Sequence, residues 1–422
     1  MEFSIKIRLN RIFIGGTMNY IPRHLTNKIK NLSSEYACIL LTGPRQVGKT
    51  TLLEHTINNK NVTFVTLDDL AERRLAQSDP ELFLNSHKQP IIIDEIQYAP
   101  ELFSYIKIAV DKGASPGSFY LTGSQSFKLM RLAQESLAGR VAIIQLQSLS
   151  QSEILNTENI EFKTEFENLK LRKGLICNMQ NIYERIFNGG MPALISKKFT
   201  DRDVYYSSYI KAFIERDVSE EIEGVDKFLF SDFIRACACR IANELNIHSI
   251  AVDVDISDDT AKRWLSVLEK SEIIFFIHPF SNNLLKRTVK NKKMYFFDTG
   301  IVAYLLKYSS SEILMNDAIN SAILENYVVS ELRKTYLNNC KEELFYYYRD
   351  VDKHEIDLII DYDNLLHPIE IKKSSVPSDK MISSFKCLDK SSRKRGAGCL
   401  ICMKDNLTVI DKENTIVPIW MI

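Results

Sequence analysis

The sequence has no long apolar run and no net charge. No stretch reaches the roughly 18 consecutive apolar residues of a membrane span, so we predict no membrane partner. Lys+Arg and Asp+Glu each number 54, so composition says nothing about nucleic acid, and any basic surface must be local. Hydrophobic residues make up 45% and charged residues 26%, as in ordinary globular proteins, and 422 residues suffice for two or three domains.

The chain also lacks the cysteine pattern of a disulfide scaffold. Its eight cysteines are scattered, which favours a reducing, cytoplasmic location. Cys399 and Cys402 form one C-x-x-C inside an apolar, strand-like run without a second pair, so we expect core packing there rather than zinc or redox chemistry. The N-terminus has basic residues but no long apolar segment, so we predict no secretory signal. We expect residues 1–19 to be an extension, with 1–17 either poorly ordered or placed before the true start at Met18.

The first informative stretch is a glycine-rich loop between a predicted strand and a predicted helix. Residues 43–50 read GPRQVGKT, which matches the P-loop pattern G-x-x-x-x-G-K-[ST] in its proper context. Such a loop wraps phosphates with backbone N–H groups, while the lysine reaches the β- and γ-phosphates and the hydroxyl binds Mg²⁺. We therefore predict ATP and Mg²⁺ as cofactors. The expected nucleotide-binding residues are Gly43, Pro44, Arg45, Gln46, Val47, Gly48, Lys49, Thr50 and Thr51, with Ser124 from a later strand.

A second stretch, PIIIDE at residues 90–95, reads as a buried parallel strand that ends in two acids. Carboxylates at the carboxyl end of such a strand lie at the ligand edge of the sheet. We expect Asp94 to hold Mg²⁺ together with Thr50, and Glu95 to orient and deprotonate the attacking water. Lys49 and Glu95 are thus predicted catalytic residues.

Other candidates follow later in the core. The strand at 119–122 ends in hydroxyls, so Thr122 or Ser124 could sense the γ-phosphate, with Gln125 as a further candidate. Arg140 is a predicted catalytic arginine, acting in cis or across a subunit boundary, or else a surface ion-pair residue. Arg216 is a second candidate, with a pair to Glu215 or Asp217 as the plainer alternative.

The order of predicted elements gives an α/β protein with a parallel-sheet P-loop NTPase core at 20–150 and a helical segment at 151–227. Residues 228–311 have winged-helix character: helices at 228–245, 249–254 and 258–269, then strands at 273–277 and 293–297. The loop between the strands is basic, whereas the third helix begins with acids. DNA contact and protein packing therefore both remain open for this module. The basic loop residues are Lys286, Arg287, Lys290 and Lys292, and the acids are Asp253, Asp255, Asp258 and Asp259.

The segment 312–422 carries chemistry of its own. A helix at 318–337 bears Glu325, a strand bears Asp357, and the next strand carries Glu370 and Lys372 on one face. This set is typical of a metal-dependent phosphodiesterase, in which the three acids bind Mg²⁺ and the lysine activates water or stabilises developing charge. A solvated strand pair with outward charges is the alternative.

The motifs together resemble the prokaryotic AAA-type P-loop ATPases that carry a C-terminal domain of unknown function. They are GPRQVGKTTLL (43–53), IIIDEIQYAP (91–100), LTGS (121–124), LAGR (137–140), GGMP (189–192), YFFDTG (295–300), ENYVVSEL (325–332) and EIDL (355–358). The resemblance covers about residues 20–405. It implies ATP binding, hydrolysis, a winged helix and a nuclease-like fold similar to PD-(D/E)xK enzymes at 312–422. The chain departs from the pattern in having no evident second sensor arginine in a helical lid.

Three functions therefore stand open. The first is an ATPase coupled to a DNA-acting nuclease module. The second is a nucleotide-switched regulator or scaffold whose inactive nuclease-like domain binds a protein partner; it predicts ATP-dependent oligomerisation or partner capture without DNA cleavage. The third is a plain ATPase motor. A homo-oligomer is compatible with the sequence, which does not determine the oligomeric state.

Overall fold

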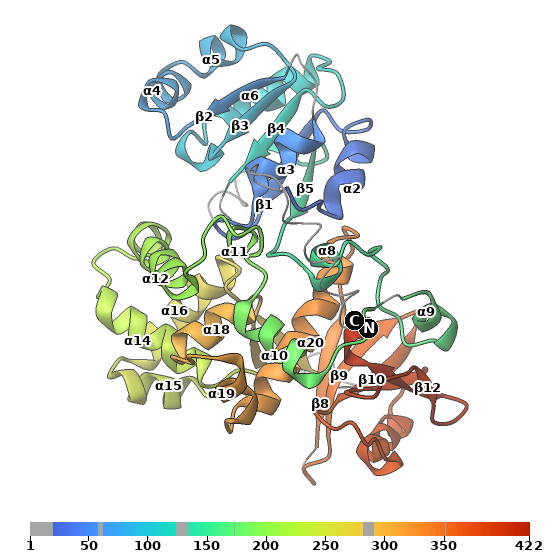
Figure 1. The fold of residues 1–422 in the computed structure, drawn as a ribbon. Helices are drawn as coiled ribbons and strands as arrows, with labels where there is room; N and C mark the ends of the chain where they lie inside the picture. The colour runs from blue at the N-terminus through green and yellow to red at the C-terminus, as the bar shows by residue number, and fades with distance from the viewer. Residues whose placement is uncertain are drawn as a thin grey trace.

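The computed structural model describes residues 20–57, 62–123, 133, 135–172, 174–281, 291–350 and 352–422. An N-terminal α/β part stands above a larger body that contains the rest of the chain (Figure 1). Within the described ranges, no helix combines the length and the apolar character needed to cross a membrane.

The N-terminal part is built on a five-stranded parallel sheet with the order β2-β3-β4-β1-β5. Its strands are β1 Cys38–Thr42, β2 Thr63–Thr66, β3 Ile91–Asp94, β4 Phe119–Thr122 and β5 Val141–Gln145. Side chains alternate between two cores, so that Cys38 and Leu40 face one layer while Ile39 and Leu41 face the other. Burial on both faces explains why these strands read as continuous apolar runs. The predicted parallel-sheet core is confirmed.

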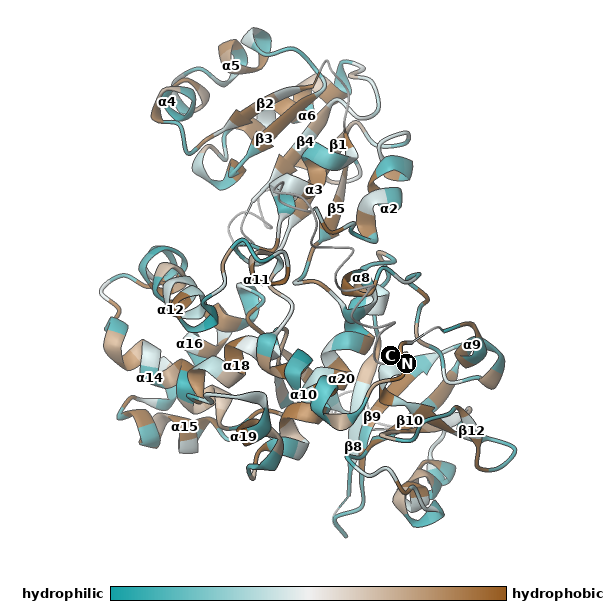
Figure 2. Cartoon of the chain, in the orientation of Figure 1, coloured by the Kyte–Doolittle hydropathy of each residue, from teal (hydrophilic) through white to brown (hydrophobic). Residues whose placement is uncertain are grey.

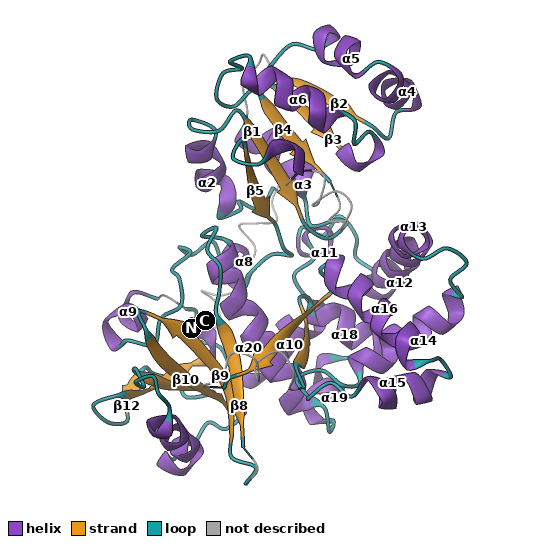
Figure 3. Ribbon diagram, turned by 180° about the vertical axis from the view of Figure 1, so that it is seen from behind, coloured by secondary structure: helices purple, strands orange, loops and turns teal. Residues whose placement is uncertain are grey.

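Helices cover both faces of this sheet (Figures 1 and 3). They are α2 Leu25–Leu32, α3 Lys49–Thr56, α4 Leu70–Ser78, α5 Pro80–Ser86, η1 Ile96–Tyr98 and α6 Leu102–Asp111. The predicted break at Pro80 is present: Asp79 ends α4, and its side chain caps α5 by accepting from the Leu82 N–H.

The middle of the chain is mainly helical. Its elements are α8 Gln151–Ile154, α9 Phe166–Leu171, α10 Met179–Asn188, α11 Pro192–Ile195, α12 Arg202–Phe213, the π-helix η2 Ile214–Val218, α13 Ser219–Glu221, α14 Lys227–Ala238, α15 Ile247–Val254 and α16 Asp258–Lys270. An antiparallel hairpin, β6 Ile274–Pro279 and β7 Lys293–Phe296, follows, and then α18 Thr299–Leu305 and α19 Ser311–Asn316.

The helix expected at 228–245 is shorter than predicted, because α14 ends at Ala238. Ala242 adopts a left-handed φ of 58°, which no helix interior tolerates. Its N–H donates to the carbonyl of Met294, and that of Leu245 donates to Lys292. The backbone hydrogen bonds of 242–245 therefore go to the edge of β7 instead of to a helix.

The C-terminal part continues the same body. It contains α20 Asn320–Leu337, β8 Phe345–Arg349, β9 Glu355–Tyr362, β10 Leu365–Ile371, η3 Asp379–Lys390, β11 Gly398–Cys402, β12 Thr408–Val409, β13 Asn414–Pro418 and η4 Ile419–Met421. The strands join the earlier hairpin in one mixed sheet of order β12-β13-β11-β10-β9-β8-β6-β7. The link is a parallel pairing of β6 with β8, His278 opposite Tyr346.

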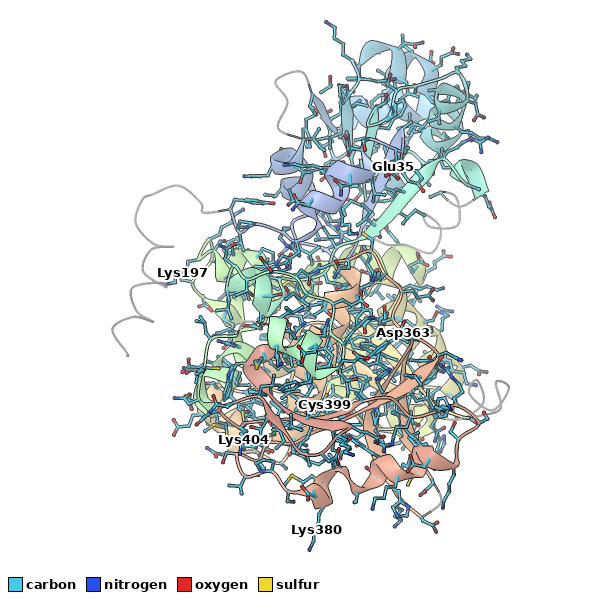
Figure 4. All side chains as sticks on the ribbon, turned by 90° about the vertical axis from the view of Figure 1, so that its right-hand side faces the viewer. Glu35, Lys197, Asp363, Lys380, Cys399 and Lys404 are labelled. Atoms are coloured by element: carbon cyan, nitrogen blue, oxygen red, sulfur yellow. The ribbon has the colours of Figure 1, made fainter. Side chains whose placement is uncertain are left out.

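One hydrophobic core unites the middle and C-terminal segments. It runs from Phe162 to Ile422 and includes residues of α14, α16, α20 and the large sheet. The brown, apolar strands and inner helix faces of Figure 2 trace this interior. Cys399 lies inside the lower body (Figure 4), and it packs in this core while Cys402 packs in a separate cluster on the other face of β11. The two thiols are therefore buried and apart, as core residues.

Candidate functional site

The P-loop connects the end of β1 to the start of α3, at the carboxyl edge of the parallel sheet. Gly43 has φ 143° and approaches the backbone of Leu146 so closely that a Cβ would lie 2.0 Å from its carbonyl oxygen. Gly48 has φ 90°, and a Cβ there would meet no atom within 4 Å. Only glycine adopts these conformations readily, so both positions of the loop require it.

Lys49 lies under this loop and is 8% exposed. Its Nζ donates to the carbonyl oxygens of Gly43 at 2.9 Å and Pro44 at 2.8 Å. Burial lowers the pKa of Lys49, whereas the nearby carboxylates of Glu95 and Glu272 oppose that shift. The ammonium group is thus held in the loop, where a phosphate oxygen could replace the two carbonyls as its partner.

Thr50 and Asp94 meet as predicted. The Thr50 hydroxyl donates to Asp94 Oδ1 at 2.6 Å, and the Thr122 hydroxyl donates to the same oxygen. The hydrogen bond from Thr122 to Asp94 arises because β4 lies between β1 and β3, which places Thr122 between the P-loop strand and the acidic strand. Hydroxyl and carboxylate oxygens are ligands that suit Mg²⁺, so these residues fit the ion. Ser124 and Gln125 lie outside the described residues.

Glu95 follows Asp94 in a left-handed conformation with φ 58°. Its N–H donates to the Thr122 hydroxyl at 3.4 Å, and its carboxylate accepts from the Gln97 amide. A non-glycine residue in this conformation is uncommon and carries strain, as residues at functional sites often do. Glu95 thus joins the group at the carboxyl edge of the sheet.

The structure separates one of the other two candidate arginines from this group. Arg140 directly precedes β5, whose first residue pairs with Cys38 at the opposite end of β1 from the P-loop. It bonds Asp111 at 2.5 Å and is partly exposed, so within this chain Arg140 is not placed to contact a phosphate at the P-loop. Arg216 is exposed on η2, and its neighbour Asp217 pairs with Arg45.

Several residues around the P-loop carry no sequence motif of their own. The buried Arg23 donates to the carbonyls of Val47 at 2.8 Å and Gln147 at 2.7 Å, and it bonds Glu153 at 2.9 Å. Gln147 in turn donates to Glu272 at 2.6 Å. Burial raises the pKa of Glu272 to about 7. Except for the bond from Arg23 to Val47, these contacts span more than 100 residues of sequence, so no local pattern could have revealed them.

In the C-terminal part, Asp357 on β9 and Glu370 on β10 share one lysine. Lys372 Nζ lies 2.5 Å from Glu370 Oε1 and 3.4 Å from Asp357 Oδ2, which also accepts from the Ile371 N–H at 2.8 Å. Burial, then the charge of Asp357, raise the pKa of Glu370 to about 8. The strand pairing thus brings together three of the four predicted residues.

Glu325 reaches the same region from α20, but its direct partners come from β7. Lys293 Nζ lies 3.1 Å from Glu325 Oε1 and 2.6 Å from Glu355 Oε1, and the Tyr295 hydroxyl donates to Glu325 at 2.7 Å. Burial raises the pKa of Glu325 to about 7, with Lys293 opposing and Asp357 adding to the shift. Lys293 and Tyr295 of β7 and Glu355 of β9 were not predicted as site residues, since they meet Glu325 only through tertiary packing.

The donor atoms of Glu325, Asp357 and Glu370 do not converge as tightly as those of a filled metal site. Among the described residues, a group with all donor atoms within 4.8 Å of one another occurs at Asp350, His354 and Cys387. There Asp350 already accepts from the Asp352 and His354 N–H groups within a turn. The C-terminal acids are instead bridged in pairs by two lysines.

Strand order, P-loop and acidic strand together define a P-loop domain of the AAA ATPase type. A family model described as an AAA domain matches residues 35–155. Two domains of unknown function follow, DUF8612 at 179–312 and DUF4143 at 320–422. The P-loop fold implies nucleotide binding.

Among relatives, the uncharacterized protein Rv2008c of Mycobacterium tuberculosis is 30% identical over 350 residues, which cover 81% of this chain and 71% of that protein. The chain belongs to the family of this protein. MJ1637 of Methanocaldococcus jannaschii, also uncharacterized, is 24% identical over 340 residues, 73% of this chain and 69% of its own.

Among solved structures, the Walker-type ATPase PABY2304 of Pyrococcus abyssi is 16% identical, with a TM-score of 0.43 over 70% of this chain and 99% of that one. The RuvB Holliday junction branch migration motor of Thermotoga maritima is 17% identical, with a TM-score of 0.29 over 60% of this chain and 89% of its own. The fold assignment itself rests on the strand order and the P-loop geometry.

Proposed function

We propose that this chain is a Mg²⁺-dependent ATPase whose nucleotide state controls its C-terminal module. The observation that carries the proposal is the hydrogen-bonded group Thr50–Asp94–Thr122 beside Lys49, at the carboxyl edge of the sheet. The strand ends of a parallel sheet are the place where α/β proteins bind phosphorylated ligands.

The residues have separate tasks in this proposal. The P-loop amides and Lys49 bind the phosphates, and Thr50 and Asp94 hold Mg²⁺. The ion, when bound, neutralises charge on the β- and γ-phosphates. Glu95 orients the attacking water and accepts its proton on a carboxylate oxygen. Thr122 fixes Asp94 and the Glu95 backbone, which keeps both acids at the phosphate side.

Lys49→Ala tests this proposal. We expect ATP hydrolysis, measured as phosphate release with and without single- and double-stranded DNA, to fall at least about a hundredfold because the phosphates lose their cation. Lys112→Ala, on the exposed surface after α6, is the matched control and should hydrolyse ATP at the wild-type rate. A Lys49→Ala variant with wild-type affinity and rate would sink the proposal.

A second candidate activity is metal-dependent cleavage of phosphodiester bonds, with DNA as the substrate, at Glu325, Asp357, Glu370 and Lys372. Four carboxylates, counting Glu355, surround the two ammonium groups of Lys293 and Lys372, so two negative charges remain when all are ionised. Glu370 Oε2 is buried without a partner. A hard divalent cation is the species that suits this donor set.

Asp357→Ala and Lys372→Ala test the second activity in an assay with Mg²⁺ or Mn²⁺. We expect each to reduce cleavage of plasmid or linear DNA about a hundredfold or more, since each removes a charge from the reacting centre. Lys380→Ala, exposed on η3 (Figure 4), is the control. If the wild type cuts no DNA while ATP changes its oligomeric state in light scattering, the C-terminal part acts as a regulatory or scaffold module for a protein partner instead.

The hairpin of β6 and β7 bears on DNA contact as well. The acids at the adjacent helix ends are paired within the chain, Asp253 with Arg240, Asp258 with His248 and Asp259 with Lys262. Lys292 lies over the Phe276 ring at 3.3 Å. Lys286, Arg287 and Lys290 lie outside the described residues. The Asp253–Arg240 and Asp259–Lys262 ion pairs offset part of the repulsion between the acids and DNA, which supports a DNA contact near this hairpin as part of the proposal.

A further inference from the structure

One arginine of the P-loop joins the ATPase core to the middle helices. Arg45 Nε lies 2.5 Å from Asp217 Oδ2, and both side chains are 14% exposed. Asp217 belongs to η2, a π-helical segment that directly continues α12. Such π-helical turns occur mostly as single turns and often at functional sites. An ion pair this sheltered holds the guanidinium in one orientation.

A second nitrogen of the same guanidinium, Nη2, has no partner. Arg45 Nη2 is buried and makes no hydrogen bond with any protein atom. A buried N–H of a cation that lacks an acceptor is costly, so native sites seldom leave one. The acceptor that fits a guanidinium is an anionic oxygen of a carboxylate or phosphate, which can take hydrogen bonds from its planar fork.

Arg45 also interacts with two other charged groups of the P-loop site. After Asp217, the carboxylate of Glu95 is the next charge that acts on Arg45, and Arg45 itself is among the charges that act on Lys49. In a P-loop site this lysine and this acid serve the terminal phosphate rather than the base or ribose.

We propose that Arg45 contacts the terminal phosphate of a nucleoside triphosphate through Nη2, while Asp217 positions it through Nε. Arg45 then distinguishes triphosphate from diphosphate, and Asp217 carries that distinction to α12. The inference rests on nucleotide binding at the P-loop. It also supplies in cis the phosphate-contacting arginine that Arg140, at the opposite end of the strands from the P-loop, does not provide within this chain.

The test is the affinity of the full chain for a non-hydrolysable ATP analogue and for ADP, both with Mg²⁺, by titration calorimetry. We expect Arg45→Gln to weaken binding of the triphosphate at least about tenfold and that of ADP less than about threefold, because the lost bond is to a charged group that ADP lacks. Arg45→Lys, which keeps the charge without the fork, should lie between wild type and Arg45→Gln.

Asp217→Asn should lower the ratio of the affinity for the triphosphate analogue to the affinity for ADP by roughly threefold or more. This effect should vanish in a chain that already carries Arg45→Gln. Glu215→Gln, exposed on the same turn, is the control and should bind both nucleotides as the wild type does. A merely structural role of the ion pair would change both affinities together, or the melting temperature alone.

The outcomes separate the two proposals. If Lys49→Ala abolishes binding of both nucleotides while Arg45→Gln leaves their ratio unchanged, the role of Arg45 is overturned and nucleotide binding stands. If the wild type binds neither nucleotide, both the proposal of nucleotide binding and the proposed role of Arg45 are overturned. An equal loss of ATP-analogue and ADP affinity in Arg45→Gln also overturns the assignment to the terminal phosphate.

Discussion

At the scale of single residues, the contacts within the P-loop site follow from its motifs, and those with the rest of the chain do not. Lys49, Thr50, Asp94 and Glu95 could be assigned because fixed spacings on a parallel sheet dictate where they meet. Thr122 was one of two open alternatives. Asp217 and Glu272, in contrast, reach the site across 172 and 125 residues from their partners Arg45 and Gln147. Such pairs depend on tertiary packing and leave no periodic signal.

Glu272 gives a prediction about pH. Because burial raises its pKa from 4.5 to about 7, the folded chain holds a proton that the unfolded chain releases between those values. Stability contributed by this group is therefore present at low pH and is lost as pH rises toward about 7, by an amount on the order of 3 kcal/mol.

Glu272→Gln removes that dependence, since an amide accepts from Gln147 without ionising. We expect the urea midpoint of Glu272→Gln to exceed that of the wild type at pH 8 and to approach it at pH 5. An identical difference between the two proteins at both pH values would contradict the assignment.

At the scale of elements, the strands of the core and the order of helices and strands after it follow from apolar runs and caps. The merging of β6 and β7 into the C-terminal sheet does not, because two Cα pairs between β6 and β8 make the link. Residues of the family motifs form hydrogen bonds that connect one secondary-structure element to another. Asp298 of YFFDTG accepts from the Gly190 N–H of GGMP at 2.8 Å, and Asn326 of ENYVVSEL bonds both backbone groups of Phe296.

Substitution of Asn326 tests how much one such connection between elements contributes to stability. It is fully buried, and its amide accepts from Phe296 N at 2.7 Å and donates to Phe296 O at 2.8 Å, which satisfies the outer edge of β7. Asn326→Ala leaves two buried backbone groups without partners, so we expect a loss of about 2–4 kcal/mol in unfolding free energy.

Chemical denaturation measures this loss, and Ser321→Ala on the exposed side of α20 is the control, with a change within about 0.5 kcal/mol. If Asn326→Ala were as stable as Ser321→Ala, the hydrogen bonds of Asn326 to Phe296 would not contribute to the stability of the edge strand.

At the scale of the whole molecule, the ATPase core touches the larger body through buried polar groups close to the P-loop. Arg23 connects Val47, Gln147 and Glu153, Arg45 connects to η2, and Gln147 connects to Glu272 at the start of the large sheet. The same sheet carries Lys293 to Glu325 and Glu355. Buried polar contacts therefore join the surroundings of the P-loop to the middle helices and to the segment that precedes β6.

This arrangement makes hydrolysis at the P-loop the central claim, and Glu95→Gln tests it most directly. The measurement is single-turnover hydrolysis of radiolabelled ATP by wild type and Glu95→Gln, with the protein-bound nucleotide recovered by rapid filtration. We predict that Glu95→Gln retains bound ATP and slows its cleavage by about a hundredfold or more, since the variant keeps the phosphate contacts and loses the base. Cleavage by Glu95→Gln at the wild-type rate, or failure of the wild type to hydrolyse ATP at all, would contradict the account.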